Sequence, residues 1–435
     1  MKIEEVLFDV VASLAETYDE VEVCAKRGRS RTLHWTAAGP TTALRREEGW
    51  AVRAGDSRRS FYFASTGSPR ADAPWPEADG QGLRLPSPRP VPRWSAPSSL
   101  DAPLIGETEA LHLFEGLARE LDTELPGARL VAGHLDDGSS ETQLASSREL
   151  ASLVRHRVAV LYLEAIAGGG RSSVSLAVAE RDARRLNPKV LARRLADRLA
   201  VHLESQGPLR DRGDFLLAPE VMVALLGALT SLWCGPQAEQ KARPLVDRRG
   251  RLGSRSLTLI DDGRLADGVL AAPVDGEGQP TREVVLVDEG FYRQPLLAWW
   301  QTQSSPAKGS GCCLRPGWRD LPKPGPSHLY LKPDPDRRVA ELLADVGRGY
   351  YLLTVDGAPR IDFEGQRFAV PVSGFVIDSG RATGSMSGSW LVGTLPSLLG
   401  GLRAKARDLT FSMHGGGMIG APTVLVRGLE LRQRP

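Results

Sequence analysis

The stretch from Ser68 to Ser99 constrains the fold most, because it is crowded with proline and shows almost no hydrophobic periodicity. Residues Leu85 to Trp94 read LPSPRPVPRW. Such a segment favours an extended, partly polyproline-like connector over a helix or a central strand. We therefore predict a first domain boundary near residue 100. Trp75 and Trp94 predict that the connector packs against a neighbouring element.

The residues before the connector predict one helix followed by strands. Apolar residues recur at helical spacing between Met1 and Glu16, which indicates an amphipathic helix. Alternating runs then predict four strands joined by short polar turns, at residues 21–25, 31–36, 49–53 and 60–64. This order predicts an α+β domain over residues 1–100.

The remaining chain divides into a middle α+β region, 101–210, and a β-rich region, 211–435. The middle region is expected to contain helices at 107–121 and 188–205, with strands at 128–133, 141–145, 157–163 and 172–178. The last region opens with an apolar helix, Pro219 to Leu232, and otherwise reads mostly as strands. Two further helices are predicted, at 336–346 and 396–404.

Charge and cysteine content exclude several classes of protein. The 435 residues carry 55 Lys and Arg against 53 Asp and Glu, so the net charge of +2 gives no electrostatic argument for nucleic acid or a membrane surface. No apolar segment reaches the roughly 18 residues that cross a bilayer, and the first residues do not resemble a secretion signal. Cys24, Cys234 and the adjacent Cys312 and Cys313 form neither a disulfide framework nor a zinc pattern. We expect a cytoplasmic protein.

Two glycine motifs resemble nucleotide-binding or catalytic signatures, but the residues within or after them do not match what those signatures require. Residues 415–420 read GGGMIG and match GxGxxG, but they run into an apparent strand and not into the helix that would hold a pyrophosphate. They predict a glycine loop between two strands. Residues 384–388 read GSMSG, in which Met386 takes the place of the nucleophile of GxSxG. Structural glycines and serines are the better interpretation.

A locally built catalytic zinc site is not expected. Zinc peptidases place at least two nitrogen ligands on one element beside a glutamate that activates water. No histidine here is followed directly by glutamate. The segment most similar to such a motif is His202-Leu203-Glu204, and it has no second histidine nearby in the sequence. Neighbouring Cys312 and Cys313 point to opposite faces if they lie on a strand, which favours a structural role for them.

The C-terminal half resembles the TldD/TldE (PmbA) metallopeptidase family. The stretches that carry the resemblance keep their order over about 200 residues: Phe215 to Val221, Gly253 to Gly263, Val274 to Gly278, Val287 to Gly290, Pro316 to Pro322, Pro326 to Leu331, Gly349 to Leu352 and Val372 to Gly380. The strands between Val21 and Ala64 fit the first domain of the family more loosely. The resemblance implies a mixed N-terminal domain and a C-terminal domain built on a large, curved antiparallel β-sheet with flanking helices, an α+β fold.

The resemblance also places the metal motif of the catalytic family members on the helix that begins near Pro219. Aligning HExxxH there puts Pro219 and Ala224 at the histidine positions and Glu220 at the glutamate. Proline and alanine cannot bind zinc. A further metal-binding cysteine of the family falls near Met413 and His414, without a definite counterpart. The pattern implies a TldE-like subunit without catalytic or metal-binding residues of its own.

The resemblance implies a heterodimer with a TldD-like chain whose zinc hydrolyses unfolded or extended peptides, such as modified-peptide precursors that lose their leaders. This chain would bind no cofactor, and its peptide-binding residues stay undefined. Two alternatives remain open. One is a stand-alone peptidase with metal ligands of another pattern. The other is a non-enzymatic peptide-binding or regulatory protein, to which the older description of the family as modulators of DNA gyrase belongs.

Overall fold

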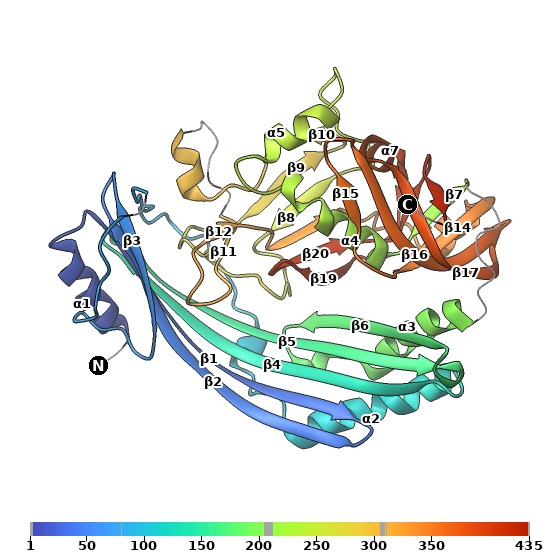
Figure 1. The fold of residues 1–435 in the computed structure, drawn as a ribbon, viewed down its shortest axis with the longest axis horizontal. Helices are drawn as coiled ribbons and strands as arrows, with labels where there is room; N and C mark the ends of the chain where they lie inside the picture. The colour runs from blue at the N-terminus through green and yellow to red at the C-terminus, as the bar shows by residue number, and fades with distance from the viewer. Residues whose placement is uncertain (1–2, 80, 204–211, 305–308, 310, 434–435) are drawn as a thin grey trace.

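The N-terminal half is organised around one curved, fully antiparallel sheet of six strands (Figure 1). A computed structural model describes residues 3–79, 81–203, 212–304, 309 and 311–433. In sheet order the strands are β3 (Ser60–Thr66), β2 (Gly39–Gly55), β1 (Glu20–Thr36), β4 (Arg129–Ser146), β5 (Ala151–Ala167) and β6 (Ser172–Glu180).

The proline-rich connector does not divide this sheet. Strand β1 pairs with β4 from Glu22↔Ser146 to Thr36↔Ala132, so residues 1–100 and 101–210, which we predicted as separate regions, contribute three strands each to one sheet. The connector lies between β3 and α2 in the sequence, and the chain that follows it comes back to the same sheet, where β4 pairs with β1. The ring of Trp75 packs edge-on against Trp50 and Phe63, as its position in the connector predicted. The predicted boundary at 210 lies outside the described residues.

Two pairs of predicted strands are single long strands. The runs 21–25 and 31–36 both belong to β1. The runs 128–133, from residue 129 on, and 141–145 both belong to β4. The polar residues between the runs suggested turns. In the sheet, the backbone of Lys26 to Ser30 is paired on both sides, by β2 and by β4. Polar side chains are tolerated there because one face of the sheet is open to solvent over part of its length.

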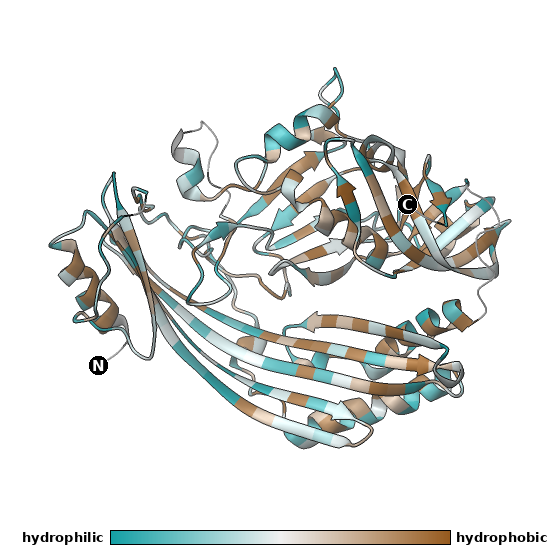
Figure 2. Ribbon diagram, viewed as in Figure 1, coloured by the Kyte–Doolittle hydropathy of each residue, from teal (hydrophilic) through white to brown (hydrophobic). Residues whose placement is uncertain are grey.

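Three helices cover the convex face of the sheet: α1 (Ile3–Ala15), α2 (Glu107–Glu124) and α3 (Pro188–Leu203) (Figure 1). Alternate residues of the long strands, among them Leu33, Leu135 and Leu161, form their buried partner surface. Figure 2 shows the matching alternation of hydropathy along these strands. The predicted positions 204 and 205 of the last helix lie outside the described residues.

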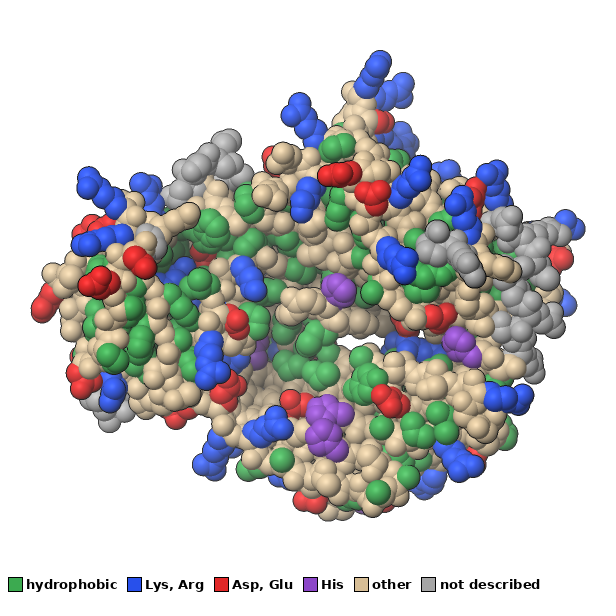
Figure 3. All heavy atoms as spheres, in the orientation of Figure 1, with side chains coloured by type: hydrophobic (Ala, Val, Ile, Leu, Met, Phe, Trp, Pro, Cys, Tyr) green, Lys and Arg blue, Asp and Glu red, His purple; other side chains and the backbone are tan. Residues whose placement is uncertain are grey.

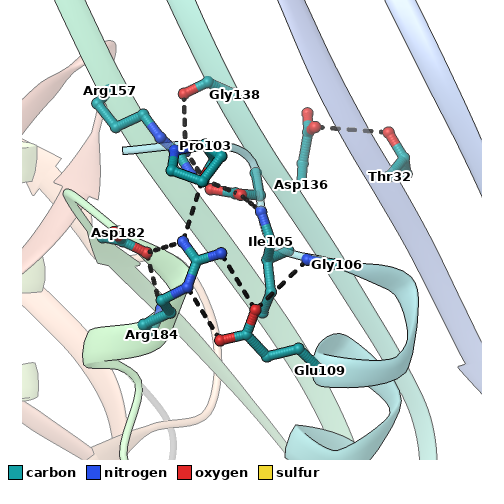
Figure 4. A network of polar contacts seen from close by, with 11 residues as sticks. Thr32, Pro103, Ile105, Gly106, Glu109, Asp136, Gly138, Arg157, Asp182 and Arg184 are labelled. Carbon is teal, nitrogen blue, oxygen red and sulfur yellow. Dashed lines mark hydrogen bonds and ion pairs between the residues drawn. The ribbon is translucent and has the colours of Figure 1, made fainter. Parts of the chain in front are cut away.

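A buried ion pair fixes the end of the connector to this convex face (Figure 4). Arg157 and Asp137 are both fully buried, and Arg157 Nη2 donates to Asp137 Oδ2 over 2.6 Å. The same carboxylate oxygen accepts from Ile105 N over 2.6 Å, while Arg157 also donates to Pro103 O. Charges this deep are tolerated only when they are paired and hydrogen-bonded. The network therefore anchors the chain just before α2.

Two sheets enclose the core of the C-terminal half. One is β10 (Phe291–Tyr292), β9 (Glu283–Asp288), β8 (Leu259–Asp262), β13 (His328–Leu331), β20 (Gly417–Ala421) and β19 (Thr410–His414), in this order. The other is β18 (Leu402–Lys405), β21 (Val424–Val426), β7 (Asp214–Leu217), β14 (Arg348–Val355), β16 (Arg367–Asp378), β17 (Arg381–Thr394) and β22 (Glu430–Arg432), with β15 (Arg360–Asp362) beside β16. Strands β11 (Cys313–Leu314) and β12 (Lys323–Pro324) pair with each other as a short antiparallel ribbon.

The predicted apolar helix lies in the core between these sheets. It is α4 (Pro219–Ala228), followed by a 3-10 turn over Thr230–Leu232. Helix α5 (Ala238–Ala242) follows, and the predicted helix 336–346 is the shorter α6 (Val339–Ala344). The predicted helix 396–404 ends early: α7 covers Leu395–Gly401, because Leu402 already pairs with Val426 in a sheet.

The glycine motifs occupy the structural places predicted for them. Residues 415 and 416 form the turn between β19 and β20, both at positive φ, and residues 384–388 lie within β17. The α+β fold with large antiparallel sheets is as predicted, although each C-terminal sheet also contains one parallel pair. In the part of the chain that the structure describes, no helix is long and apolar enough to span a bilayer.

Candidate functional site

The concave face of the six-stranded sheet turns toward the C-terminal half, and the molecule is hollowed along this boundary (Figure 3). One cavity here has a volume of about 610 Å³. We call it the α4 cavity, because the first turn of α4 reaches it. Strands β5 and β6, helix α3, the end of β14 with the segment after it, and the end of β19 form the rest of its wall. It is the place where the helix of the expected metal motif meets the N-terminal half.

Glu220 lines the α4 cavity, and its carboxylate forms an ion pair with Arg198. Arg198 of α3 donates through Nη2 to Glu220 Oε2, and through Nη1 to the backbone oxygen of Ser175 on β6. The other carboxylate oxygen, Glu220 Oε1, accepts from Val355 N over 3.3 Å. The two side chains are 11 % and 28 % exposed, so solvent screens the pair only in part. Both oxygens of Glu220 are therefore engaged by the protein itself.

Helix α3 lines the cavity with a basic stripe. Arg194, Arg198 and His202 follow one another at four-residue spacing and so share one face of the helix. His202 Nε2 lies 3.7 Å from Asp356 Oδ1, which follows β14. Burial, and after it the charge of Arg198, lowers the pKa of Arg194, while Glu220 acts in the opposite direction. Our sequence reasoning missed this stripe, although its spacing is visible within the predicted helix 188–205.

The positions aligned with HExxxH lie on one face of α4. Pro219, Glu220, Ala224 and Ala228 are half-buried, whereas the rest of the helix is buried. Proline at the first helical position is compatible with the helix because the first amides have no intrahelical partner.

The structure also brings the end of β19 to this helix. Met413 lines the α4 cavity together with Glu220. The ring of His414 lies against α4 at Gly227, where an added Cβ would come within 2.7 Å of it. The sequence alone left open which of these two residues is the counterpart of the family's cysteine, and the structure places both of them beside α4.

The side chains at this face do not fit a catalytic zinc ion. Pro219 and Ala224 offer no ligand atom, and Arg198 already holds Glu220. His202 and Asp356 face the cavity, yet in the described part of the chain no third ligand side chain joins them within 4.8 Å. Zinc sites need three or four nitrogen, sulfur or carboxylate ligands around one point.

A second cavity, of about 230 Å³, lies where the sheet meets the loops before β11. Lys26, Thr142 and His156 line its sheet side, with Asp275 and Arg315 opposite. Behind it, Glu22 of β1 accepts from Arg53 Nη2 over 2.6 Å and from Arg315 Nη2 over 2.5 Å. Burial alone would raise the pKa of Glu22, but the two guanidinium groups lower it to about 2.

Asp275, Glu277 and Cys313 form the one group of three possible metal ligands within 4.8 Å of one another among the described residues. Each is already used structurally. Asp275 Oδ1 accepts from the backbone of Glu277 and Gln279, and Cys313 Sγ lies 3.0 Å from Glu277 Oε2. Burial, and then Asp275 and Glu277, raise the pKa of the Cys313 thiol, which keeps it protonated as a hydrogen-bond donor.

The adjacent cysteines have different neighbours, as opposite-facing residues should. Cys312 Sγ contacts Leu297 O over 3.8 Å, whereas Cys313 contacts Glu277. The sequence alone showed that Asp275 and Glu277 are two residues apart. Nothing in the sequence placed Cys313 beside them, 36 residues away from Glu277.

Comparisons with known proteins agree with this architecture. The structure of TldE from Thermococcus kodakarensis superposes with a TM-score of 0.83 and 17 % sequence identity, covering 98 % of this chain and 99 % of that one. A metalloprotease TldD homolog of Haemophilus influenzae is 24 % identical over 166 residues, 38 % of this chain and 32 % of that protein. An uncharacterized protein of Methanocaldococcus jannaschii is 28 % identical over 125 residues, 28 % of this chain and 29 % of that protein.

These two sequence relatives are matched over less than a third of their own length. The likeness to the Thermococcus structure, at 17 % identity, concerns the fold. The family comparison covers more of the chain than these two sequence relatives do. The family model of the PmbA/TldA metallopeptidase C-terminal domain matches residues 211–433, from just before β7 to just after β22. The chain therefore belongs to the PmbA/TldA metallopeptidase family.

Proposed function

We propose that this chain is the non-catalytic subunit of a two-chain zinc peptidase. The observation that supports this most is the state of the α4 face: Pro219 and Ala224 lack ligand atoms, and Glu220 is held by Arg198. A glutamate that activates zinc-bound water needs a free carboxylate oxygen near the metal. Here both oxygens are occupied by Arg198 and by the amide of Val355.

The catalytic zinc would then reside in a TldD-like partner that carries HExxxH. This chain would stabilise that partner and complete the chamber in which an extended peptide is held. Strand β6 is an edge strand of its sheet and lines the α4 cavity, so backbone groups are available for a peptide without regard to its sequence. Modified-peptide precursors that lose a leader are substrates of this kind.

Four free cysteines, in a family of peptidases, fit a reducing compartment, and we place the complex in the cytoplasm. The near-neutral charge of +2 supports neither a nucleic-acid partner nor a membrane surface.

Co-expression with a TldD-like chain tests the proposal. The expected result is a stable complex that binds zinc and cleaves an unfolded peptide, while this chain alone does neither. Stoichiometric zinc and cleavage by the purified chain alone would support the stand-alone peptidase instead. If no complex forms with any HExxxH-bearing chain, the proposal fails and a peptide-binding or regulatory protein becomes the better account.

A further inference from the structure

The α4 cavity contains a third cation besides Arg198 and His202, the guanidinium group of Arg194. Arg194 lines the cavity, and in the part of the chain that the structure describes its side chain makes no hydrogen bond or ion pair. Its neighbours on the same face of α3 differ from it, because Arg198 is paired with Glu220 and His202 lies beside Asp356. Among the described residues, the guanidinium N–H groups that Arg194 presents at the cavity therefore have no hydrogen-bond acceptor.

An enclosed, unpaired guanidinium favours an anion. Arginine keeps its charge in proteins, so withdrawing it from water without a counter-charge is unfavourable. The lowered pKa of Arg194, caused mainly by burial, reflects this environment. Glu220 also attracts it, but the hydrogen bonds of that carboxylate go to Arg198 and Val355. A planar guanidinium binds carboxylates and phosphates best, through two parallel N–H···O bonds.

The other walls of the cavity favour a monoanion attached to an apolar chain. Glu220 and Asp356 face the same space, and their charges oppose a dianion such as phosphate more strongly than a carboxylate. Val178, Val355 and Met413 supply apolar surface for side chains. A volume of about 610 Å³ has room for several non-hydrogen groups beyond the carboxylate itself.

We propose that Arg194 binds a peptide carboxylate, in the first place the C-terminal carboxylate of an extended peptide lying in the α4 cavity. This inference deepens the proposed role in peptide handling and rests on it. It adds a polarity to that role: the peptide would enter with its carboxyl end toward α3, and peptides with an amidated end would bind less well.

The test measures binding of fluorescent peptides to the full-length chain by anisotropy. Three versions of one unstructured peptide are used: a free C-terminal acid without Asp or Glu, its C-terminal amide, and the amide with one internal glutamate. A charge-assisted contact predicts that the amide binds about ten to a hundred times more weakly than the acid. Recovery of affinity in the third version would assign the site to acidic side chains as well as to chain ends.

Arg194→Gln should lower the affinity for the acid to that of the amide and leave the amide unchanged. Arg193→Gln is the matched control, because Arg193 is exposed on the same helix and lies outside the cavity. Arg193→Gln should retain the full preference for the acid. If Arg194→Gln does not fold, the comparison of acid with amide on the unaltered chain still decides.

Equal affinities for the acid and the amide, absence of measurable binding to either, or an undiminished preference in Arg194→Gln would each overturn the proposal. The outcome is independent of zinc and of the partner chain. A carboxylate preference without complex formation would therefore refute the proposed subunit role alone, and a complex without the preference would refute Arg194 alone.

Discussion

Arg198 on α3 donates to the carboxylate of Glu220 on α4, and this contact joins the N-terminal half of the chain to the first turn of the helix that begins the C-terminal core. The pair sits in a cavity wall, with Glu220 28 % exposed. It defines the α4 face as a structural contact between the halves, where the family resemblance places a metal motif in other chains.

The Arg198–Glu220 contact predicts a measurable coupling. Arg198→Met and Glu220→Gln should each lower the free energy of unfolding by about 1 to 3 kcal/mol, because each leaves the other partner's polar group unpaired. In a double-mutant cycle the two losses should be less than additive, with a coupling of about 1 kcal/mol. Denaturant unfolding measures this. Additive losses would show that the two side chains do not interact.

Glu22→Gln should destabilise the junction between the sheet and the loops before β11. It leaves Arg315 and Arg53, whose side chains are 5 % and 12 % exposed, without their shared carboxylate. Removing one member of a buried ionic cluster costs about 3 to 5 kcal/mol. Glu115→Gln, exposed on α2, is the control and should change little. A loss for Glu22→Gln no greater than that of the control would contradict the network.

Acidification should weaken the fold between about pH 6.5 and pH 4 through His328. This residue is 1 % exposed, accepts from Leu270 N over 3.2 Å and contacts Asp262 O. Burial is the main cause that lowers its pKa from 6.5 to about 4. The unfolded chain therefore binds more protons in this range, so stability present above pH 6.5 is lost as the pH falls toward 4, up to about 3 kcal/mol.

The pH dependence separates His328 from other histidines. His328→Asn should flatten the stability profile between pH 6.5 and 4, measured by denaturant unfolding at a series of pH values. His112→Asn, exposed on α2, should leave the slope intact. An unchanged slope in His328→Asn would assign the acid sensitivity elsewhere, with His156, whose pKa burial also lowers to about 4, as the next residue to substitute.

Gly349→Ala should disrupt the pairing of β14 with β7. A Cβ at this position would lie 1.9 Å from Asp214 O, a backbone atom that cannot move independently of its strand. The expected loss is about 2 to 4 kcal/mol. Gly400→Ala is the matched control, because nothing lies within 4 Å of its added Cβ. Similar melting temperatures for the two variants would contradict the described strand pairing.

Local patterns predicted most elements of this fold. The predicted helices at 107–121 and 188–205 correspond to α2 and α3, and the glycine loop at 415–416 joins two strands as expected. These elements are determined by periodicity and by glycine's access to positive φ, which operate over a few residues. The family resemblance likewise located α4.

Pairings between distant residues were beyond such patterns. The proline-rich stretch indicated a boundary, yet β1 and β4 on its two sides are hydrogen-bonded neighbours. The full lengths of β1 and β4 could not be predicted locally, because their polar middle segments are strands only through pairing with neighbouring strands. Arg198 and Glu220 are brought together by the packing of α3 against the C-terminal half, a contact between residues with no shared local signal.

Metal content and hydrolysis in the two-chain complex test the central claim most directly. The complex with a TldD-like chain is compared with one in which the glutamate of the partner's HExxxH is changed to glutamine. We predict about one zinc per heterodimer in both, peptide cleavage in the first and none in the second. Two zinc ions per heterodimer, or cleavage that persists when the partner's glutamate is replaced, would contradict a non-catalytic role for this chain.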